Sequence, residues 1–153
     1  MGTKAAKKRL LVVDCRFEFE YNGGHIVGAM NLPDPQQLDT TFFRDSQTVA
    51  MLMRRRVQIV FHCEFSSKRG PSMCSRLREM DRKFNEYPLL FYPEVYLLEG
   101  GYKEFYGKFP EACEPNGYVP MEHPDFAQEC ADTQSKLRHN KKKRKRQLQT
   151  QNI

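Results

Sequence analysis

The residues best suited to chemistry lie in one short segment. Cys63 follows His62 and an apolar run, Val57–Phe61, and five residues separate it from Arg69, which stands just before Gly70. A cysteine thiolate is a strong nucleophile, and an arginine can bind two phosphoryl oxygens with its planar fork. The spacing therefore indicates cysteine-dependent phosphate chemistry. Taken alone, it also fits a buried cysteine beside an unrelated surface arginine.

The chemistry also needs a surrounding that favours a thiolate and holds three oxygens. A helix N-terminus and nearby cations lower the pKa of a thiol, and consecutive backbone N–H groups can curl into a nest around an anion. The residues expected to bind phosphate, mainly through their amides, are Glu64, Phe65, Ser66, Ser67, Lys68 and Arg69.

The elements around this loop predict an α/β domain with a mostly parallel central sheet. Short continuous apolar runs are typical of strands that are covered on both faces, and two occur at Leu10–Val13 and Val57–Phe61. A further strand is expected at Glu94–Leu98. Apolar residues stepping by three and four predict a helix after Gly70, at Met73, Leu77, Met80 and Phe84. Strands alternating with helices favour three layers.

The remaining stretches set the expected domain limits. A turn and a second short strand are expected within His25–Leu32, and further helices within Gln36–Phe43, Thr48–Arg56 and Tyr102–Phe109. We expect residues 1–9 to be a disordered basic lead-in, residues 10–130 to form the domain, and residues 131–153 to be a disordered basic tail.

Composition excludes several classes of protein. The chain has 153 residues, of which 39% are hydrophobic and 29% charged, which suits one soluble globular domain. No apolar run approaches the length that spans a bilayer, and no signal peptide is evident. The five cysteines, without paired CxxC spacing, favour reduced intracellular thiols. Neither a metal nor another cofactor is expected.

The net charge of +6 is concentrated in the last residues. Residues 131–153 hold eight Lys or Arg against Asp132, a net +7, so the other 130 residues sum to −1. A nucleic-acid-binding fold is therefore disfavoured. The block Lys141–Arg146 fits a nuclear import signal, a patch for an acidic partner, or a merely solvated end.

The motifs resemble the catalytic domain of the M-phase inducer phosphatases. Those that carry the resemblance are Val13-Asp14-Cys15-Arg16, Glu20–Ile26, His62–Ser67, Arg69-Gly70-Pro71, Tyr92-Pro93-Glu94 and Gly100–Phe105. The resemblance implies a rhodanese-like fold. It also implies removal of phosphate from phosphotyrosine and phosphothreonine of a cyclin-dependent kinase bound to its cyclin, which promotes mitotic entry. It further implies a location in nucleus and cytoplasm.

The resemblance also implies roles for individual residues. Cys63 is the expected nucleophile, forming a cysteinyl-phosphate, and Arg69 the group that stabilises the transition state. Cys15 matches the family's second cysteine, a redox partner for the nucleophile. Arg78 and Arg82 match substrate-docking positions, although a solvated helix face explains them equally well.

Three departures from the family pattern affect these expectations. Lys68 stands where the family usually has glutamate, so Glu64 becomes the expected general acid, and slower turnover of poor leaving groups is expected. Ser72 and Ser75 replace basic residues. Only nine residues precede Leu10, so the usual N-terminal strand and helix are expected to be lacking.

Other functions remain open from the sequence. Lys68 and the short N-terminus favour a catalytically weak rhodanese-like module that binds a kinase or phosphoprotein. An arsenate reductase shares the spacing of Cys63 and Arg69, whereas a sulfurtransferase usually has a loop one residue shorter.

Overall fold

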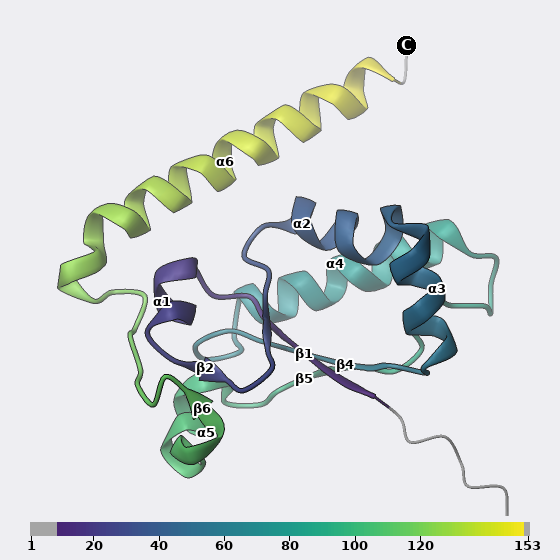
Figure 1. Cartoon of the computed structure of the whole chain (residues 1–153). Coiled ribbons are helices and arrows are strands. Elements are labelled where there is room, and N and C mark those ends of the chain that lie inside the picture. The colour runs from purple at the N-terminus through teal and green to yellow at the C-terminus, as the bar shows by residue number, and fades with distance from the viewer. Residues whose placement is uncertain (1–8, 152–153) are drawn as a thin grey trace, which may run out of the picture.

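The computed structural model describes residues 9–151, in which strands and helices alternate (Figure 1). The strands are β1 (Leu10–Asp14), β2 (His25–Ile26), β3 (Met30–Asn31), β4 (Gln58–His62), β5 (Val95–Leu97) and β6 (Cys113–Glu114). The α-helices are α1 (Glu18–Asn22), α2 (Pro35–Asp39), α3 (Ser46–Arg54), α4 (Arg69–Phe84), α5 (Gly101–Lys108) and α6 (Ala127–Thr150). A π-helical turn (Thr40–Arg44) and two 3₁₀ turns (Pro110–Ala112 and Pro124–Phe126) complete the elements.

The central sheet has four parallel strands in the order β3-β1-β4-β5 (Figure 1). β1 runs beside β4 in register, with Leu10 opposite Gln58 and Asp14 opposite His62. A separate antiparallel pair joins β2 to β6. The expected mostly parallel sheet is confirmed, and the carboxyl ends of β1 and β4 lie side by side, so both strands deliver their following residues to one place.

The core lies between the sheet and the helices α2, α3 and α4, which cover one face (Figure 1). Ile59 and Phe61 of β4 are fully buried there against Leu77 of α4, and Val60, between them, is only half-buried on the other face. This alternation follows from the two-residue period of a strand. The predicted helix after Gly70 is confirmed as α4.

Helix α6 corrects one expectation. Residues 131–150 are helical, so the prediction of a disordered tail beginning at residue 131 is wrong. No Gly or Pro follows Pro124, and the stretch is rich in good helix formers such as Ala, Gln, Lys and Arg. Six of its cations form the block Lys141–Arg146 in the second half. The predicted disorder of residues 1–8 lies outside the described residues.

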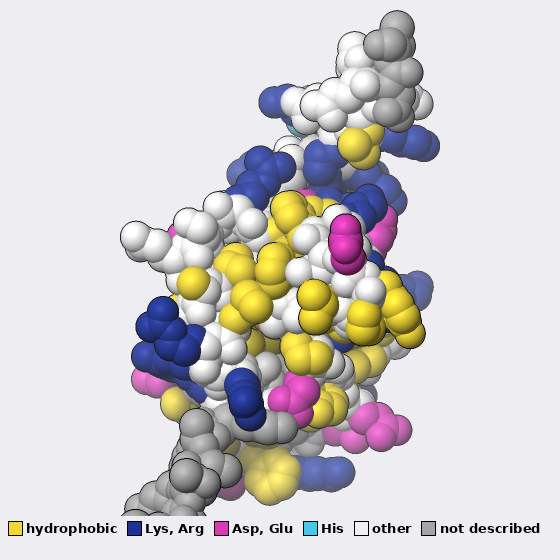
Figure 2. Space-filling view, turned by 90° about the vertical axis from the view of Figure 1, so that its right-hand side faces the viewer, with side chains coloured by type: hydrophobic (Ala, Val, Ile, Leu, Met, Phe, Trp, Pro, Cys, Tyr) yellow, Lys and Arg dark blue, Asp and Glu magenta, His cyan; other side chains and the backbone are white. Residues whose placement is uncertain are grey.

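The end of the molecule that carries α3 and the end of α4 presents an apolar surface. Figure 2 shows hydrophobic side chains gathered there below the Lys and Arg side chains of α6. Its exposed members include Met51, Met53, Phe84 and Leu89. This surface lies at the opposite end of α4 from the Cys63 loop (Figure 1). None of the described helices is both long and apolar enough to span a bilayer.

Candidate active site

Cys63 lies directly between β4 and the loop that leads into α4. Its side chain is 3% exposed, and the backbone N–H of Gly70, in the first turn of α4, donates a hydrogen bond to Sγ over 3.2 Å. The helix thus presents its positive end to the sulfur. This is the arrangement that stabilises negative charge on a thiolate.

The loop between Cys63 and Arg69 turns its amides away from the protein's own acceptors. The carbonyls of Cys63 and Glu64 accept hydrogen bonds from the N–H groups of Tyr102 and Lys103, both over 3.0 Å. Within the described residues, no amide N–H from 64 to 69 donates a hydrogen bond. Ser66 has a left-handed φ of 55°, a conformation that bends such a loop into a concave nest. The backbone therefore supports the predicted anion cradle.

Gly101 lets helix α5 approach the back of this loop. A Cβ at this position would lie 2.5 Å from the carbonyl oxygen of Glu64 and 2.7 Å from that of Cys63, and the residue has a φ of 62°. Only glycine satisfies both the spacing and the dihedral angle without strain. The loop is consequently supported from behind by the N-terminus of α5.

Arg69 is held by a carboxylate that the sequence did not single out. Its Nη1 and Nη2 donate to the two oxygens of Glu20 over 2.6 and 3.0 Å. The Arg69 guanidinium also lies 5.1 Å from the ring centre of Phe17. Burial opposes the charge of Arg69, but the hydrogen bonds and charge of Glu20 outweigh it, so the pKa of Arg69 is raised. The guanidinium is permanently charged and fixed in direction.

Glu64 does not project freely into the loop. One carboxylate oxygen accepts a hydrogen bond from the Tyr118 hydroxyl, and the other accepts one from the Met121 N–H over 3.2 Å and lies 4.0 Å from Nη2 of Arg69. Burial and the bond to Glu64 raise the pKa of Tyr118, which keeps its hydroxyl protonated as the donor. Glu64 therefore links the loop to the segment before α6.

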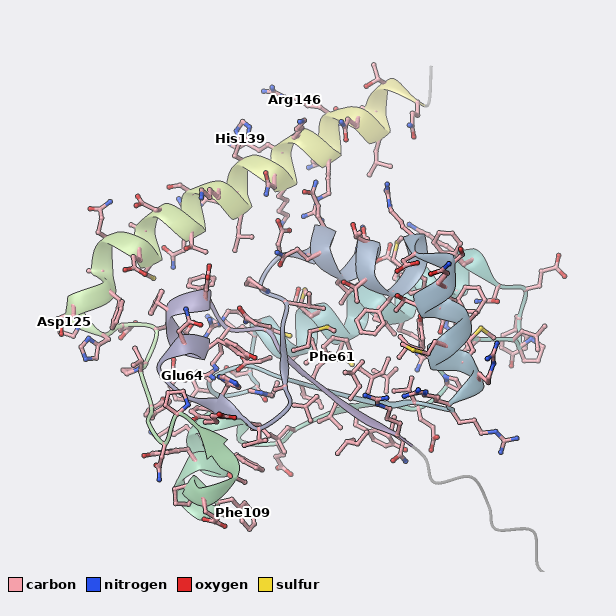
Figure 3. The ribbon with its side chains drawn as sticks, in the orientation of Figure 1. Phe61, Glu64, Phe109, Asp125, His139 and Arg146 are labelled. Atoms are coloured by element: carbon pink, nitrogen blue, oxygen red, sulfur yellow. The ribbon has the colours of Figure 1, made fainter. Side chains whose placement is uncertain are left out.

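The loop opens into a cavity of about 530 Å³ that borders the sulfur. Figure 3 places Glu64 at the end of the sheet, beneath α1, with Phe61 inside the sheet. The residues lining the cavity are Phe17, Cys63, Glu64, Phe65, Ser67, Lys68, Arg69, Met121 and Gln134. Lys68 is exposed at the rim, so this cavity combines a nucleophile, two cations and a free nest of amides.

Helix α6 forms the outer wall beside this site. Gln134 borders the first cavity, and a second, smaller cavity of about 240 Å³ lies between α6 and the start of α4. Its walls include Arg69 and Ser72 on one side and Leu137, Arg138, Lys141 and Arg144 on the other. Three of the tail's cations therefore face the domain, close to the Cys63 loop.

Cys15 lies beside Cys63, as the strand register requires. Its N–H donates to the carbonyl of His62 over 2.8 Å, one position beyond the pair of Asp14 and His62. Adjacent strands lie about 4.8 Å apart, a Cα spacing that a disulfide tolerates. Burial, reinforced by the charges of Asp14 and Cys63, raises the pKa of the Cys15 thiol well above its ordinary value. Cys15 is therefore a neutral thiol next to the nucleophile.

The remaining predicted residues are spread more widely. Arg78 is half-buried and donates to the carbonyl of Tyr92 over 3.0 Å, whereas Arg82 is exposed on the next turn of α4. The N–H at Nδ1 of His25 donates to the carbonyl of Tyr21 over 2.8 Å, which anchors its loop. His62 is buried and contacts the carbonyl of Cys63 through Nδ1, consistent with a structural role.

Glu20, Phe17 and Tyr118 complete the site without having been predicted. Phe17 and Glu20 lie in a stretch where aromatic and acidic residues alternate, and nothing in that pattern separates Glu20 from the exposed Glu18. Tyr118 comes from a turn-rich stretch with no periodicity. In the described part of the chain, no group of three or more His, Cys, Asp or Glu side chains is arranged to hold a metal.

The fold and the loop define an α/β domain in which the Cys63 loop begins at the carboxyl end of a central parallel strand. The sequence matches the rhodanese-like domain model over residues 3–108, and the chain belongs to this family. It is similar to M-phase inducer phosphatase 1-B of Xenopus laevis, with 47% identity over 146 residues, covering 95% of this chain and 26% of the relative. M-phase inducer phosphatase 3 of Homo sapiens is 46% identical over 143 residues, covering 92% of this chain and 30% of the relative.

Solved structures agree on the fold. An As-Sb reductase from Leishmania major superposes with a TM-score of 0.52 at 26% identity, covering 69% of this chain and 70% of that one. A yeast protein tyrosine phosphatase of the rhodanese family superposes with a TM-score of 0.50 at 23% identity, covering 77% and 83%. The expected rhodanese-like fold is confirmed. The chain spans only 26 to 30% of the length of the two curated relatives described above.

Proposed function

We propose that this chain is a cysteine-dependent protein phosphatase that acts on phosphotyrosine and phosphothreonine. The observation that carries the proposal is the position of the Cys63 sulfur at the floor of a nest of free amides, with the charged Arg69 beside it. The similarity to M-phase inducer phosphatases, which are named for this activity, supports it. Phosphoryl transfer needs mainly positioning and charge stabilisation, which these groups supply.

The proposed reaction has two steps. The Cys63 thiolate forms a bond to phosphorus while the bond to the leaving oxygen breaks, and that oxygen takes up a proton. Water then attacks the phosphorus of the cysteinyl-phosphate, and the sulfur leaves as a thiolate together with inorganic phosphate. In both steps the amides of residues 64–69 and the guanidinium of Arg69 bind the three outer oxygens.

The leaving oxygen needs a proton donor at this site. Glu64 borders the cavity beside Cys63, but both its oxygens accept hydrogen bonds from the protein. Among the residues that line this cavity, Glu64 alone carries a carboxyl group, so we assign it the role of acid. Lys68, at the rim, supplies charge for substrate binding but no acid in place of the glutamate that relatives usually carry.

For the substrate we propose a cyclin-dependent kinase in complex with its cyclin, which places the chain in mitotic entry. The exposed Arg82, with Arg78 one turn before it, is the proposed docking contact on α4. The structure supports Arg82 more strongly, because Arg78 is already bonded to the carbonyl of Tyr92. Cys15, beside Cys63, is the proposed redox partner that forms a disulfide and protects the nucleophile from irreversible oxidation.

One experiment tests the activity directly. Wild-type protein and Cys63→Ser are compared for release of phosphate, first from a small aryl phosphate and then from a doubly phosphorylated cyclin-dependent kinase. We expect Cys63-dependent release from both. If neither substrate releases phosphate, the phosphatase proposal is wrong and a phosphoprotein-binding module is the remaining function. Arsenate reduction without phosphate release would favour an arsenate reductase. The phosphatase is preferred because the curated relatives carry that name.

We also propose import into the nucleus through Lys141–Arg146, with residence in both nucleus and cytoplasm. All but Arg144 in this block are exposed on α6. A fluorescent fusion of the full chain carrying Lys142→Gln, Lys143→Gln and Lys145→Gln should lose nuclear accumulation in cells. Unchanged accumulation would count against an import receptor that reads this block.

A further inference from the structure

A guanidinium group has two forks, and the structure shows which one Glu20 uses. Both hydrogen bonds of Arg69 run from Nη1 and Nη2 to Glu20, so the carboxylate caps the end of the side chain. The lateral fork, formed by Nε and the outer hydrogen of Nη2, is left for another planar pair of oxygens. A phosphoryl group bound by the lateral fork and the carboxylate bound by the end fork can therefore coexist on one arginine.

Glu20 is itself rigidly placed. Its side chain is fully buried, and Oε2 accepts a second hydrogen bond, from the N–H of Phe17 over 2.8 Å. Arg69 is 23% exposed, with its charged end between this buried carboxylate and the cavity. The ring of Phe17, three residues before Glu20, also lies beside the guanidinium. The segment from Phe17 to Glu20 thus holds the orientation of Arg69 from behind.

We infer that Glu20 is a positioning residue that aims the lateral fork of Arg69 at the oxyanion bound by the Cys63 loop. The inference rests on the proposed function for its catalytic meaning, but its direct consequence is a binding geometry. Charge-assisted bidentate pairs are short and strongly directional, which is the property that positioning requires. Without the pair, a four-torsion side chain samples other rotamers and loses entropy on every binding event.

When Glu20 loses its charge, simple electrostatics and positioning predict opposite changes in the affinity of the site for an anion. Removing a carboxylate next to Arg69 makes the cavity more positive, so electrostatics alone predicts tighter binding of an anion. Positioning predicts weaker binding, because the guanidinium is no longer held in line. The entropy lost when an unrestrained arginine side chain is ordered on each binding event corresponds to a loss of affinity of up to roughly tenfold.

The test measures tungstate, a phosphate-like oxyanion, binding to the reduced full chain by calorimetry. Glu20→Gln keeps the shape of the side chain and removes its charge, and Glu18→Gln is the matched control, an exposed residue on the same helix. The same change is repeated in an Arg69→Lys background, where no fork remains to be aimed. Circular dichroism and thermal unfolding establish that each variant is folded. Glu20→Asp, which keeps the buried charge but is shorter, replaces Glu20→Gln if that variant does not fold.

We expect Glu20→Gln to weaken tungstate binding several-fold, up to about tenfold, and Glu18→Gln to change it less than about twofold. Arg69→Lys and Arg69→Lys/Glu20→Gln should bind alike, within threefold, since the two positions act as one unit. Equal or tighter binding by folded Glu20→Gln overturns the inference, as does an equal loss in both backgrounds. A wild type that binds tungstate but releases no phosphate overturns the proposed function and leaves this inference standing.

Discussion

The Cys63 loop and helix α6 border the same cavity, but the protein holds them in different ways. Behind the loop, two carbonyls bind the start of α5, and a buried carboxylate binds Arg69. On α6 no side chain is fully buried. Its contacts include a hydrogen bond of 3.0 Å from Asn140 to Asp34 and, at its base, a stacked pair of Phe126 and Phe19.

The contrast separates the reacting groups from the wall around them. Reaction rates depend on distances being fixed before the substrate arrives, and the loop is built for that. Helix α6 is attached by a few surface contacts, so its charged side chains can instead be substituted without disturbing the fold. We therefore expect changes behind the loop to abolish activity, and changes on α6 to adjust binding alone.

The largest expected effect comes from disturbing the support of the loop. Gly101→Ala should reduce turnover at least about a hundredfold and destabilise the protein by more than about 2 kcal/mol, because its Cβ would collide with the loop carbonyls at a strained φ. Turnover of an aryl phosphate and urea unfolding measure these effects. Gly107→Ala is the matched control, in the same helix and with nothing within 4 Å of the new Cβ, and it should be neutral or slightly stabilising.

A second change tests the chemistry at the rim. Lys68→Glu should speed release from substrates with poor leaving groups about tenfold or more, because it returns a carboxyl group to the loop. Good leaving groups, which need no proton, should change little. Steady-state kinetics on aryl phosphates of graded leaving-group pKa measure the difference, and Lys108→Glu on exposed α5 surface controls for the change in net charge. A flat response across the series would remove the need for an acid at position 68.

Acid should destabilise the loop region more than α6. Burial lowers the pKa of His62, against the opposing pull of Asp14. The unfolded chain therefore binds a proton below about pH 6.5 that the folded chain resists, and the free energy of unfolding falls as the pH drops below that value.

Urea unfolding between pH 7.5 and 5.5 measures this loss. His62→Asn should be less stable at neutral pH but show a shallower fall on acidification. His139→Asn, a matched change on exposed α6, should retain the wild-type slope. An unaltered slope in His62→Asn would assign the acid sensitivity to other groups.

The smallest effect is expected on α6 itself. Replacing Arg138, Lys141 and Arg144, which line the smaller cavity, with Gln should weaken binding of a kinase substrate a few-fold, with the effect fading at high salt. Aryl phosphate turnover and thermal stability should hold, since surface changes are usually within about 0.5 kcal/mol. The control removes equal charge from Lys142, Lys143 and Lys145, outside the cavity lining. Equal weakening by both triples would mean that net charge alone matters.

Local pattern was sufficient to predict the parts of the site that lie close together in sequence. Cys63, the loop and Arg69 follow one strand and open one helix, so their spacing alone indicated where they would meet. The parallel sheet followed from the apolar runs at β1, β4 and β5. Because β1 and β4 pair in register, the position of Cys15 also agrees with its expected place beside the nucleophile.

The partners from distant segments could not be predicted in this way. Glu20 is 49 residues from Arg69, and Tyr118 is 54 from Glu64. Neither pair leaves a periodic signal, because each depends on how two segments far apart in the chain pack together. Helix α6 could not be predicted for another reason: it lacks apolar periodicity. It rests instead on intrinsic propensity and on a half-buried stripe that includes Gln134, Leu137 and Arg144.

The register between β1 and β4 fixes three consecutive residues relative to Cys63: Asp14, which ends β1, and Cys15 and Arg16, which follow it. Side chains alternate across a strand, so an insertion or deletion of one residue in β1 would exchange Cys15 for a charged neighbour, Asp14 or Arg16, at the position facing Cys63. The buried pair of Asp14 and Arg16 would then lose its place under the loop. Transferring the Cys63 loop into another protein would therefore require both β1 and β4, kept in their native register.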